Sequence, residues 1–169
     1  MKHSIRIRRG ARPALAAAIA SAMAAASGIA QAASSATQDV DITVQNVNEI
    51  SVGTAVTLTI NTAIAGGNPG GTALSNYSIT TNSSTSKKIT AQLVGALTAG
   101  LSLSVSVQAP STGTSAGVAV LTTSPSDVVN SIEAVAASGL TISYSATATV
   151  AVAPNTYSAD VTYTIVDDS

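Results

Sequence analysis

Residues 140–166 read LTISYSATATVAVAPNTYSADVTYTIV, and this stretch decides the fold. Apolar and polar side chains alternate along 140–149 and again along 157–166, which is the pattern of two β-strands that each have one buried and one solvated face. Pro154 and Asn155 lie between the two runs and favour a turn. We therefore predict a C-terminal hairpin. Because an isolated hairpin is barely stable in water, the rest of the chain must supply further strands.

The same alternation recurs at short intervals upstream, and it predicts strands at 39–44, 54–61, 76–81, 87–94, 101–108 and 118–122. Gly-, Pro- and Ser-rich stretches separate them, and residues 65–71, with four Gly and a Pro, are predicted to be a loop. In residues 124–139, Val128, Ile132 and Val135 have helical spacing, although β-branched residues favour a strand. We expect a turn and then a short helical or irregular stretch there.

About eight short strands with frequent turn residues predict an all-β protein, an antiparallel β-sandwich of immunoglobulin-like character. A barrel with a ligand cavity is the alternative. The phase of the alternation directs all four tyrosines inward. We therefore expect them to belong to the core, and the competing interpretation is a platform on which sugars stack. The tyrosines are Tyr77, Tyr144, Tyr157 and Tyr163.

The first 32 residues have the features of a secretory signal peptide. Five basic residues between positions 2 and 12 precede an uncharged, alanine-rich stretch at 14–29, and Ala30-Gln31-Ala32 matches the small-x-small cleavage pattern. We predict a signal peptide at 1–32 and a single β-sandwich domain at 33–169. A retained membrane anchor is the alternative, but the stretch is short for a stable span. The predicted location is extracellular, at the cell surface, with the periplasm as the alternative.

Cleavage before Ala33 would remove five of the seven basic residues and leave Lys87 and Lys88 against all eight acidic residues, a net charge of −6. This balance argues against nucleic acid and against anionic membrane surfaces as partners, because both require Lys or Arg facing phosphates. The chain has no cysteine, so no disulfide can stabilise an exported fold, and packing, a bound ion or assembly must do so.

Nucleophilic catalysis has little support in the sequence. Residues 33–169 contain no His or Cys, so a catalytic triad lacks its usual base. A Ser–Lys pair would have to use Lys87 or Lys88, which open a predicted strand and are expected to keep a sheet edge soluble. We predict that the protein is not an enzyme.

Paired carboxylates could hydrolyse glycosides, and the nearest candidate pairs are Asp39 with Asp41 and Asp167 with Asp168, but we expect all four acids to be solvated. With oxygen ligands alone, calcium is the ion that suits this chain, but Asp39-x-Asp41 is a weak match to a calcium loop. We therefore predict no catalytic, cofactor-binding or metal-binding residues.

Three stretches resemble strands of secreted bacterial surface β-sandwiches, including fimbrial subunits and the WxL-like and biofilm-fibre families. They are DVDITV at 39–44, NYSITT at 76–81 and DVTYTIVD at 160–167. The resemblance spans most of the chain after residue 32. It implies a non-enzymatic structural or adhesive surface protein, a subunit of an extracellular filament or biofilm matrix. The alternative function is a carbohydrate-binding module, whose partner would be a surface glycan.

Residues 50–86 and 89–126 contain no charge, so neutral strands such as 101–108 would aggregate unless their edges are covered or paired. The segment 33–44 is the best candidate for pairing with a neighbour, because its alternate residues Val40, Ile42 and Val44 could fill pockets of another sheet. We expect self-association by β-strand addition through this N-terminal strand. The alternative is that the strand closes its own sandwich.

Export through cleavage of the predicted leader has a direct test. Mass spectrometry of the exported protein should show an N-terminus at or near Ala33, because the small-x-small pattern ends at Ala32. An N-terminus that retains the leader would contradict the secretion argument.

Overall fold

The computed structural model describes residues 35–169, so the predicted signal peptide at 1–32 lies outside the described residues. The chain divides into two units at Thr43/Val44. Residues 35–43, the described part of the first unit, contain no helix and no strand, and their side chains are exposed. All the strands among residues 35–169 belong to the second unit, Val44–Ser169. In the part of the chain that the structure describes, no helix is long and apolar enough to cross a membrane.

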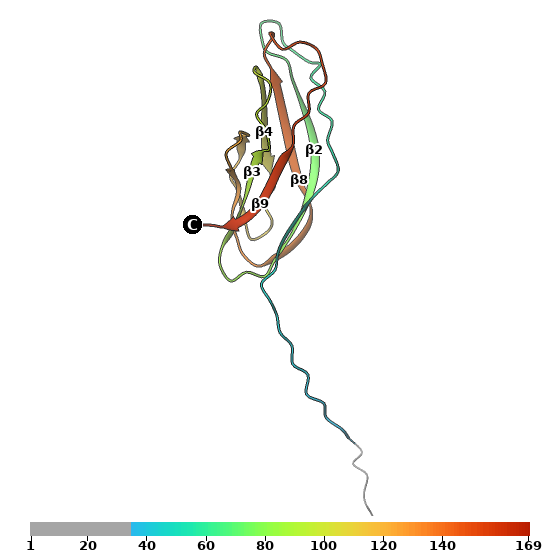
Figure 1. Ribbon diagram of the computed structural model, residues 1–169, viewed down its shortest axis with the longest axis vertical. Coiled ribbons are helices and arrows are strands. Elements are labelled where there is room, and N and C mark those ends of the chain that lie inside the picture. The colour runs from blue at the N-terminus through green and yellow to red at the C-terminus, as the bar shows by residue number, and fades with distance from the viewer. Residues whose placement is uncertain (1–34) are drawn as a thin grey trace, which may run out of the picture. The chain divides into compact units, whose positions relative to one another are not determined.

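The described strands form two antiparallel sheets, one of five strands and one of four, an all-β arrangement compatible with a β-sandwich (Figure 1). The first sheet has the order β1 (Asn48–Val52), β2 (Gly70–Thr81), β8 (Val135–Ala148), β4 (Leu101–Val107) and β6 (Val118–Val120). The second has the order β5 (Thr114–Ser115), β7 (Ser126–Ile132), β3 (Lys87–Leu93) and β9 (Val161–Asp167).

The inner faces of the two sheets share one hydrophobic core. Ile79, Val105 and Ile142 contribute to it from the first sheet, and Ile89 and Val128 contribute from the second, all with at most 1% of their surface exposed. Along β3 and β4 buried residues alternate with less buried ones, as expected for strands with one buried face. The predicted inward phase of 76–81, 87–94 and 101–108 is therefore confirmed.

The predicted C-terminal hairpin is wrong, although its alternation is right. β8 lies between β2 and β4 in the first sheet, whereas β9 pairs with β3 in the second. The connection 149–160 passes from one sheet to the other, and β9 begins at Val161 instead of residue 157 (Figure 1). Alternation specifies which face of a strand is buried, but the pairing partner depends on residues far away in the sequence.

The predicted helical or irregular stretch at 124–139 is also wrong, because it forms β7 and the start of β8. Val128, Val129 and Ile132 are buried, a spacing that resembles a helix. The cause is the ladder between β7 and β3, which shifts register twice, so the period of two is broken. Ser131, next to one shift, has a positive φ of 57°.

Residues 54–61 do not form the predicted strand, although Val56, Leu58 and Ile60 are half-buried in the expected phase. Conversely, β2 begins at Gly70, inside the predicted loop 65–71. The two segments lie very close together at Gly71. A Cβ at this position would lie 2.2 Å from the Thr59 carbonyl oxygen, so only glycine allows the segment 54–61 to cross so close to β2.

The predicted strand at 39–44 has no pairing partner among residues 35–169. Its alternating apolar residues point into solvent, with Val40 71%, Ile42 83% and Val44 79% exposed. The structure therefore shows no strand at 39–44, and the expectation that this segment pairs with a neighbouring copy stays a prediction. An extended segment needs a neighbouring strand to complete its hydrogen bonds, and here none is present.

Candidate functional site

Both lysines of the described chain lie on β3, an inner strand of the second sheet, and not at an edge as predicted. Lys87 Nζ is bonded to a carboxylate oxygen of Asp167 on β9. Lys88 Nζ lies 3.2 Å from Asp127 Oδ2 on β7. The two ion pairs therefore connect β3 to its neighbours on either side, and neither ammonium group protects an edge.

The contact between Lys87 and Asp167 affects the acidity of the Asp167 carboxyl group. The hydrogen bond from Lys87, together with its charge, holds the pKa of Asp167 below the ordinary value. The Thr85 hydroxyl adds a weaker contact with the same carboxylate, at 3.4 Å. The Lys87 side chain is only 10% exposed, so its ammonium group is occupied and enclosed. A Ser–Lys mechanism would need that group as a free amine.

The two pairs of acids considered for catalysis do not form facing carboxylates. Asp167 binds the lysine on β3, whereas Asp168 accepts a hydrogen bond of 2.7 Å from the backbone N–H of Ser131. Asp39 and Asp41 lie in the unpaired N-terminal segment. Among residues 35–169, no group of three His, Cys, Asp or Glu side chains is close enough to hold a metal ion.

Three tyrosines have their hydroxyl groups tied to the sandwich. The Tyr77 hydroxyl donates to the backbone carbonyl of Gln108 at 2.6 Å. The hydroxyls of Tyr163 and Tyr144 lie 2.8 Å apart and connect β9 to β8 across the two sheets. Burial raises the pKa of Tyr77 to about 12 and also raises the pKa values of Tyr144 and Tyr163. The predicted core role is confirmed for these three.

Tyr157 differs from the prediction, because it lies in the loop 149–160 and is 38% exposed. Its hydroxyl donates to the Ala153 carbonyl at 2.8 Å within the same loop. A platform for sugars needs aromatic faces that are open to solvent. The described chain offers one such ring, and the other three are built into the core.

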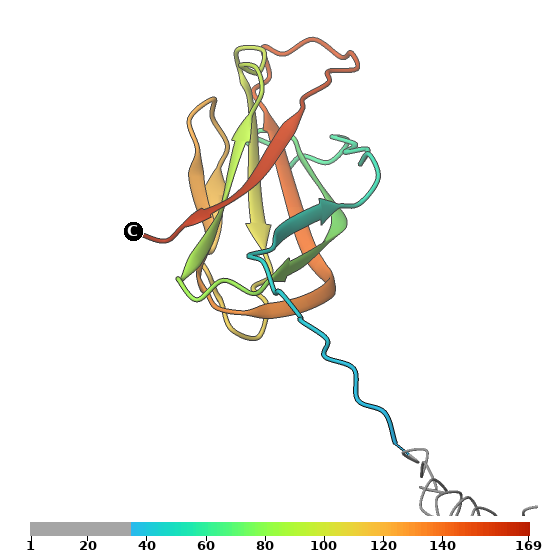
Figure 2. The same cartoon turned by 60° about the horizontal axis from the view of Figure 1, so that its bottom comes forward.

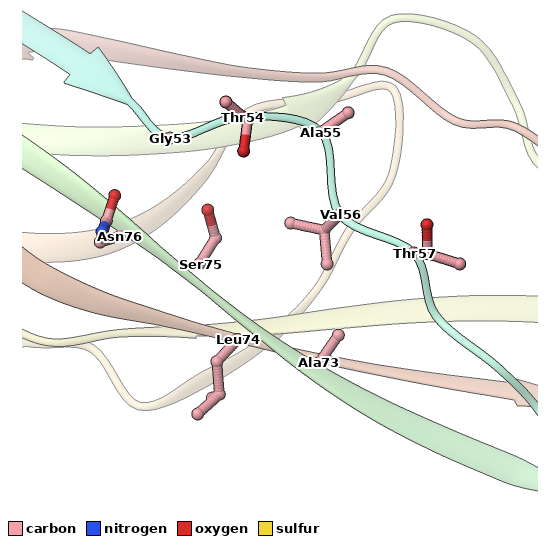
Figure 3. A pocket seen from close by; sticks show the side chains of 9 residues that line it. All are labelled: Gly53, Thr54, Ala55, Val56, Thr57, Ala73, Leu74, Ser75 and Asn76. Carbon is pink, nitrogen blue, oxygen red and sulfur yellow. The ribbon is translucent and has the colours of Figure 1, made fainter.

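An open hollow lies between β2 and the segment that precedes it in the chain (Figure 3). A backbone bond from Gly53 N–H to Asn76 C=O lies at one end of it, and farther along the same two segments Gly70 N–H bonds to Thr62 C=O. Between these bonds, residues 54–61 stand opposite the shorter stretch 71–75, so the longer side bulges away from β2. In Figure 3 the Val56 side chain points toward β2, whereas Leu74 points away.

The residues around this hollow do not suit a small-molecule site. The lining is small, aliphatic or neutral polar, without a charged or aromatic side chain, and consists of Gly53, Thr54, Ala55, Val56, Thr57, Ala73, Leu74, Ser75 and Asn76. Ligand pockets usually combine aromatic or apolar walls with a few converging polar groups. The hollow is better explained as the space that the bulge leaves.

The outer edge of β9 has a row of backbone groups without a partner. Asp160 C=O and Asp168 N–H both bond to the β3 side, at the two ends of the ladder. Even-numbered residues therefore face β3, and odd-numbered residues direct their N–H and C=O groups to the other side. Within 35–169, no hydrogen bond reaches the outward backbone groups of Val161, Tyr163 and Ile165. Figure 2 shows β9 at the margin of its sheet.

The core is incompletely covered at the same edge. The inward side chains of Val161, Tyr163 and Ile165 are only half-buried, whereas Ile89 and Ala91 on the adjoining β3 are fully buried. Side chains on an inner strand are covered from both sides, but those of β9 have a neighbouring strand on one side only. The edge therefore lacks a hydrogen-bonded strand, and its inward side chains are only partly covered, with β1 of the first sheet close by.

The sequence identified the apolar face of β9 and singled out 33–44 as a strand for pairing with a neighbour, but it did not identify β9 as an unpaired edge. Strand edges have no residue signature of their own, and the absence of Lys and Pro from 161–167 is the only signal that could have indicated this edge.

No protein-family model, no curated protein and no solved structure matches this chain.

The ion pair of Asp167 predicts how the free energy of unfolding depends on pH. The pKa of Asp167 is lower in the folded state than its ordinary value of 3.8, so its stabilising contribution is complete above that value. The contribution is lost as the pH falls through the folded-state pKa. The Asp167→Asn variant should lack this part of the acid dependence when urea unfolding is followed between about pH 2 and pH 7.

The control is Asp160→Asn, which removes an acid from the opposite end of β9 without touching Lys87. If Asp167→Asn keeps the acid dependence of the original protein, the ion pair does not contribute in solution.

Proposed function

We propose that this chain is a secreted, non-enzymatic structural protein whose copies join by β-strand addition, as subunits of an extracellular filament or matrix. The observation that supports the proposal is the exposed N-terminal segment, in which Val40, Ile42 and Val44 are all at least 71% exposed. Burying one such side chain contributes about 1.5–3 kcal/mol. A segment that alternates in this way while unpaired is suited to a partner's sheet.

The fold agrees with a structural role. The strands enclose a packed core, and both lysines of the described chain form ion pairs, Lys87 with Asp167 and Lys88 with Asp127. We propose that the sandwich is immunoglobulin-like, with support from two antiparallel sheets around one core and a connection that passes between them. Secretion is supported by the leader pattern at 1–32.

A carbohydrate-binding module remains a different functional class, and it is not the function we propose. Its distinguishing feature would be a set of exposed aromatic rings. Tyr157 is 38% exposed, but Tyr77 is only 2% exposed and the Tyr144–Tyr163 pair joins the two sheets. No observation on the described chain therefore favours this alternative.

Replacing the three apolar residues of the segment tests the proposal. The triple variant Val40→Ser, Ile42→Ser, Val44→Ser should remain monomeric at concentrations at which the original exported chain associates, as measured by multi-angle light scattering. The reason is that these side chains would contribute the buried area of the contact. Far-UV circular dichroism should be unchanged, since the substituted residues lie outside the strands.

The matched control changes the intervening residues, Asp39→Asn, Asp41→Asn and Thr43→Ser, and should associate as the original does. An original chain that stays a strict monomer at high concentration would overturn the proposal. So would a triple variant that associates as well as the control.

A further inference from the structure

We propose that the outer edge of β9 is the surface that receives residues 40–44 of a second copy. This inference rests on the proposed function, because it names the partner surface for the same segment. The occupant would extend the second sheet by one strand, giving it five strands like the first sheet. The partner is therefore another copy of this chain, bound through its backbone and through three apolar side chains.

Among the described strands, β9 is the longest edge. The edge strands are β1 with five residues and β6 with three in the first sheet, and β5 with two and β9 with seven in the second. β9 contains no Pro, no Lys and no register shift, which are the usual devices that block an edge. Its one acid, Asp167, is occupied by Lys87. No described strand is hydrogen-bonded to this edge, although β1 of the first sheet lies close to β9.

The segment and the edge match in phase. The outward backbone groups of β9 belong to residues whose side chains point inward, so a partner residue opposite each of them also points inward. If Ile42 stands opposite Tyr163, then Val40 and Val44 also stand opposite inward residues. Each such pair exchanges both backbone bonds, which gives about six hydrogen bonds over the contact. The three half-buried side chains of β9 would gain the cover that they lack.

Charge selects the direction of the added strand. A parallel strand with all three apolar pairs in place would put Asp39 opposite Asp160, and like charges directly opposite are destabilising. The antiparallel strand with Ile42 opposite Tyr163 puts Asp41 opposite Thr164 and keeps acids apart. We therefore assign the antiparallel register, in which Thr43 stands opposite Thr162.

The hollow beside β2 is a weaker acceptor. Its exposed backbone is limited to Thr72 and Leu74, the two positions between the bonds at Gly70 and Asn76 that face the bulged segment. The Thr59 carbonyl already lies against the inner face at Gly71, where an entering side chain would have to sit. This stretch of β2 is therefore shorter than the edge of β9, and the Thr59 carbonyl already occupies the side that would accept apolar side chains.

Disulfide trapping between two single-cysteine variants tests the site. Because the chain has no cysteine of its own, the introduced residue is the only thiol in each variant. The exported chain with Asp41→Cys is mixed with the exported chain with Thr164→Cys. Opposed residues that do not exchange backbone bonds have Cα atoms about 4.5 Å apart, which suits a disulfide. Mass spectrometry should find the 41–164 disulfide at least about tenfold above the 41–72 disulfide formed with Thr72→Cys. Because each chain has one cysteine, this product can only join two copies.

A second pair in the same register, Thr43→Cys with Thr162→Cys, tests the same contact independently if a variant of the first pair does not fold. Val120→Cys on the β6 edge is a further control, expected to give no more product than Thr72→Cys. Association by light scattering is measured on the same mixtures. If copies associate but the disulfides form at residue 72 or 120, the assigned edge is wrong while the proposed function stands. If copies do not associate at all, both are overturned.

Discussion

The backbone groups along the outer edge of β9 are the constraint on which the rest of the account depends. Every amide and carbonyl in a strand needs a partner, and an edge that lacks one must be satisfied by water or by another chain. Here the unpaired edge coincides with half-buried Val161, Tyr163 and Ile165, so the core is also incompletely covered at that place. The segment 40–44 has exposed apolar side chains and no paired strand. One contact between copies would satisfy both.

β9 is open on one side and firmly held on the other. Its ladder with β3 runs without a register shift, Lys87 binds Asp167 at one end, and the Tyr163 hydroxyl meets Tyr144 across the core. A strand that is already fixed in an extended shape loses little further conformational entropy when a partner pairs with it. These polar contacts hold β9 against β3 and β8.

The sequence predicted the buried faces well, because side-chain direction follows locally from a period of two. Ile89 and Val105 are buried as their alternation predicted. It could not predict partners, which depend on distant residues, so β8 and β9 were assigned to one hairpin although they lie in different sheets. β7 was missed because its register shifts give buried residues a helical spacing. The lysines were placed at an edge because a single strand does not reveal which strands flank it.

Amide hydrogen exchange, resolved by residue, tests the central claim most directly. In the monomeric triple serine variant, the amides of Val161, Tyr163 and Ile165 should exchange rapidly, and those of Thr162 and Thr164, which face β3, should exchange slowly. In the assembled protein the first group should slow by about a hundredfold or more. Outward amides that are already protected in the monomer, or that remain unprotected in the assembly, would contradict an edge of β9 completed by a second copy.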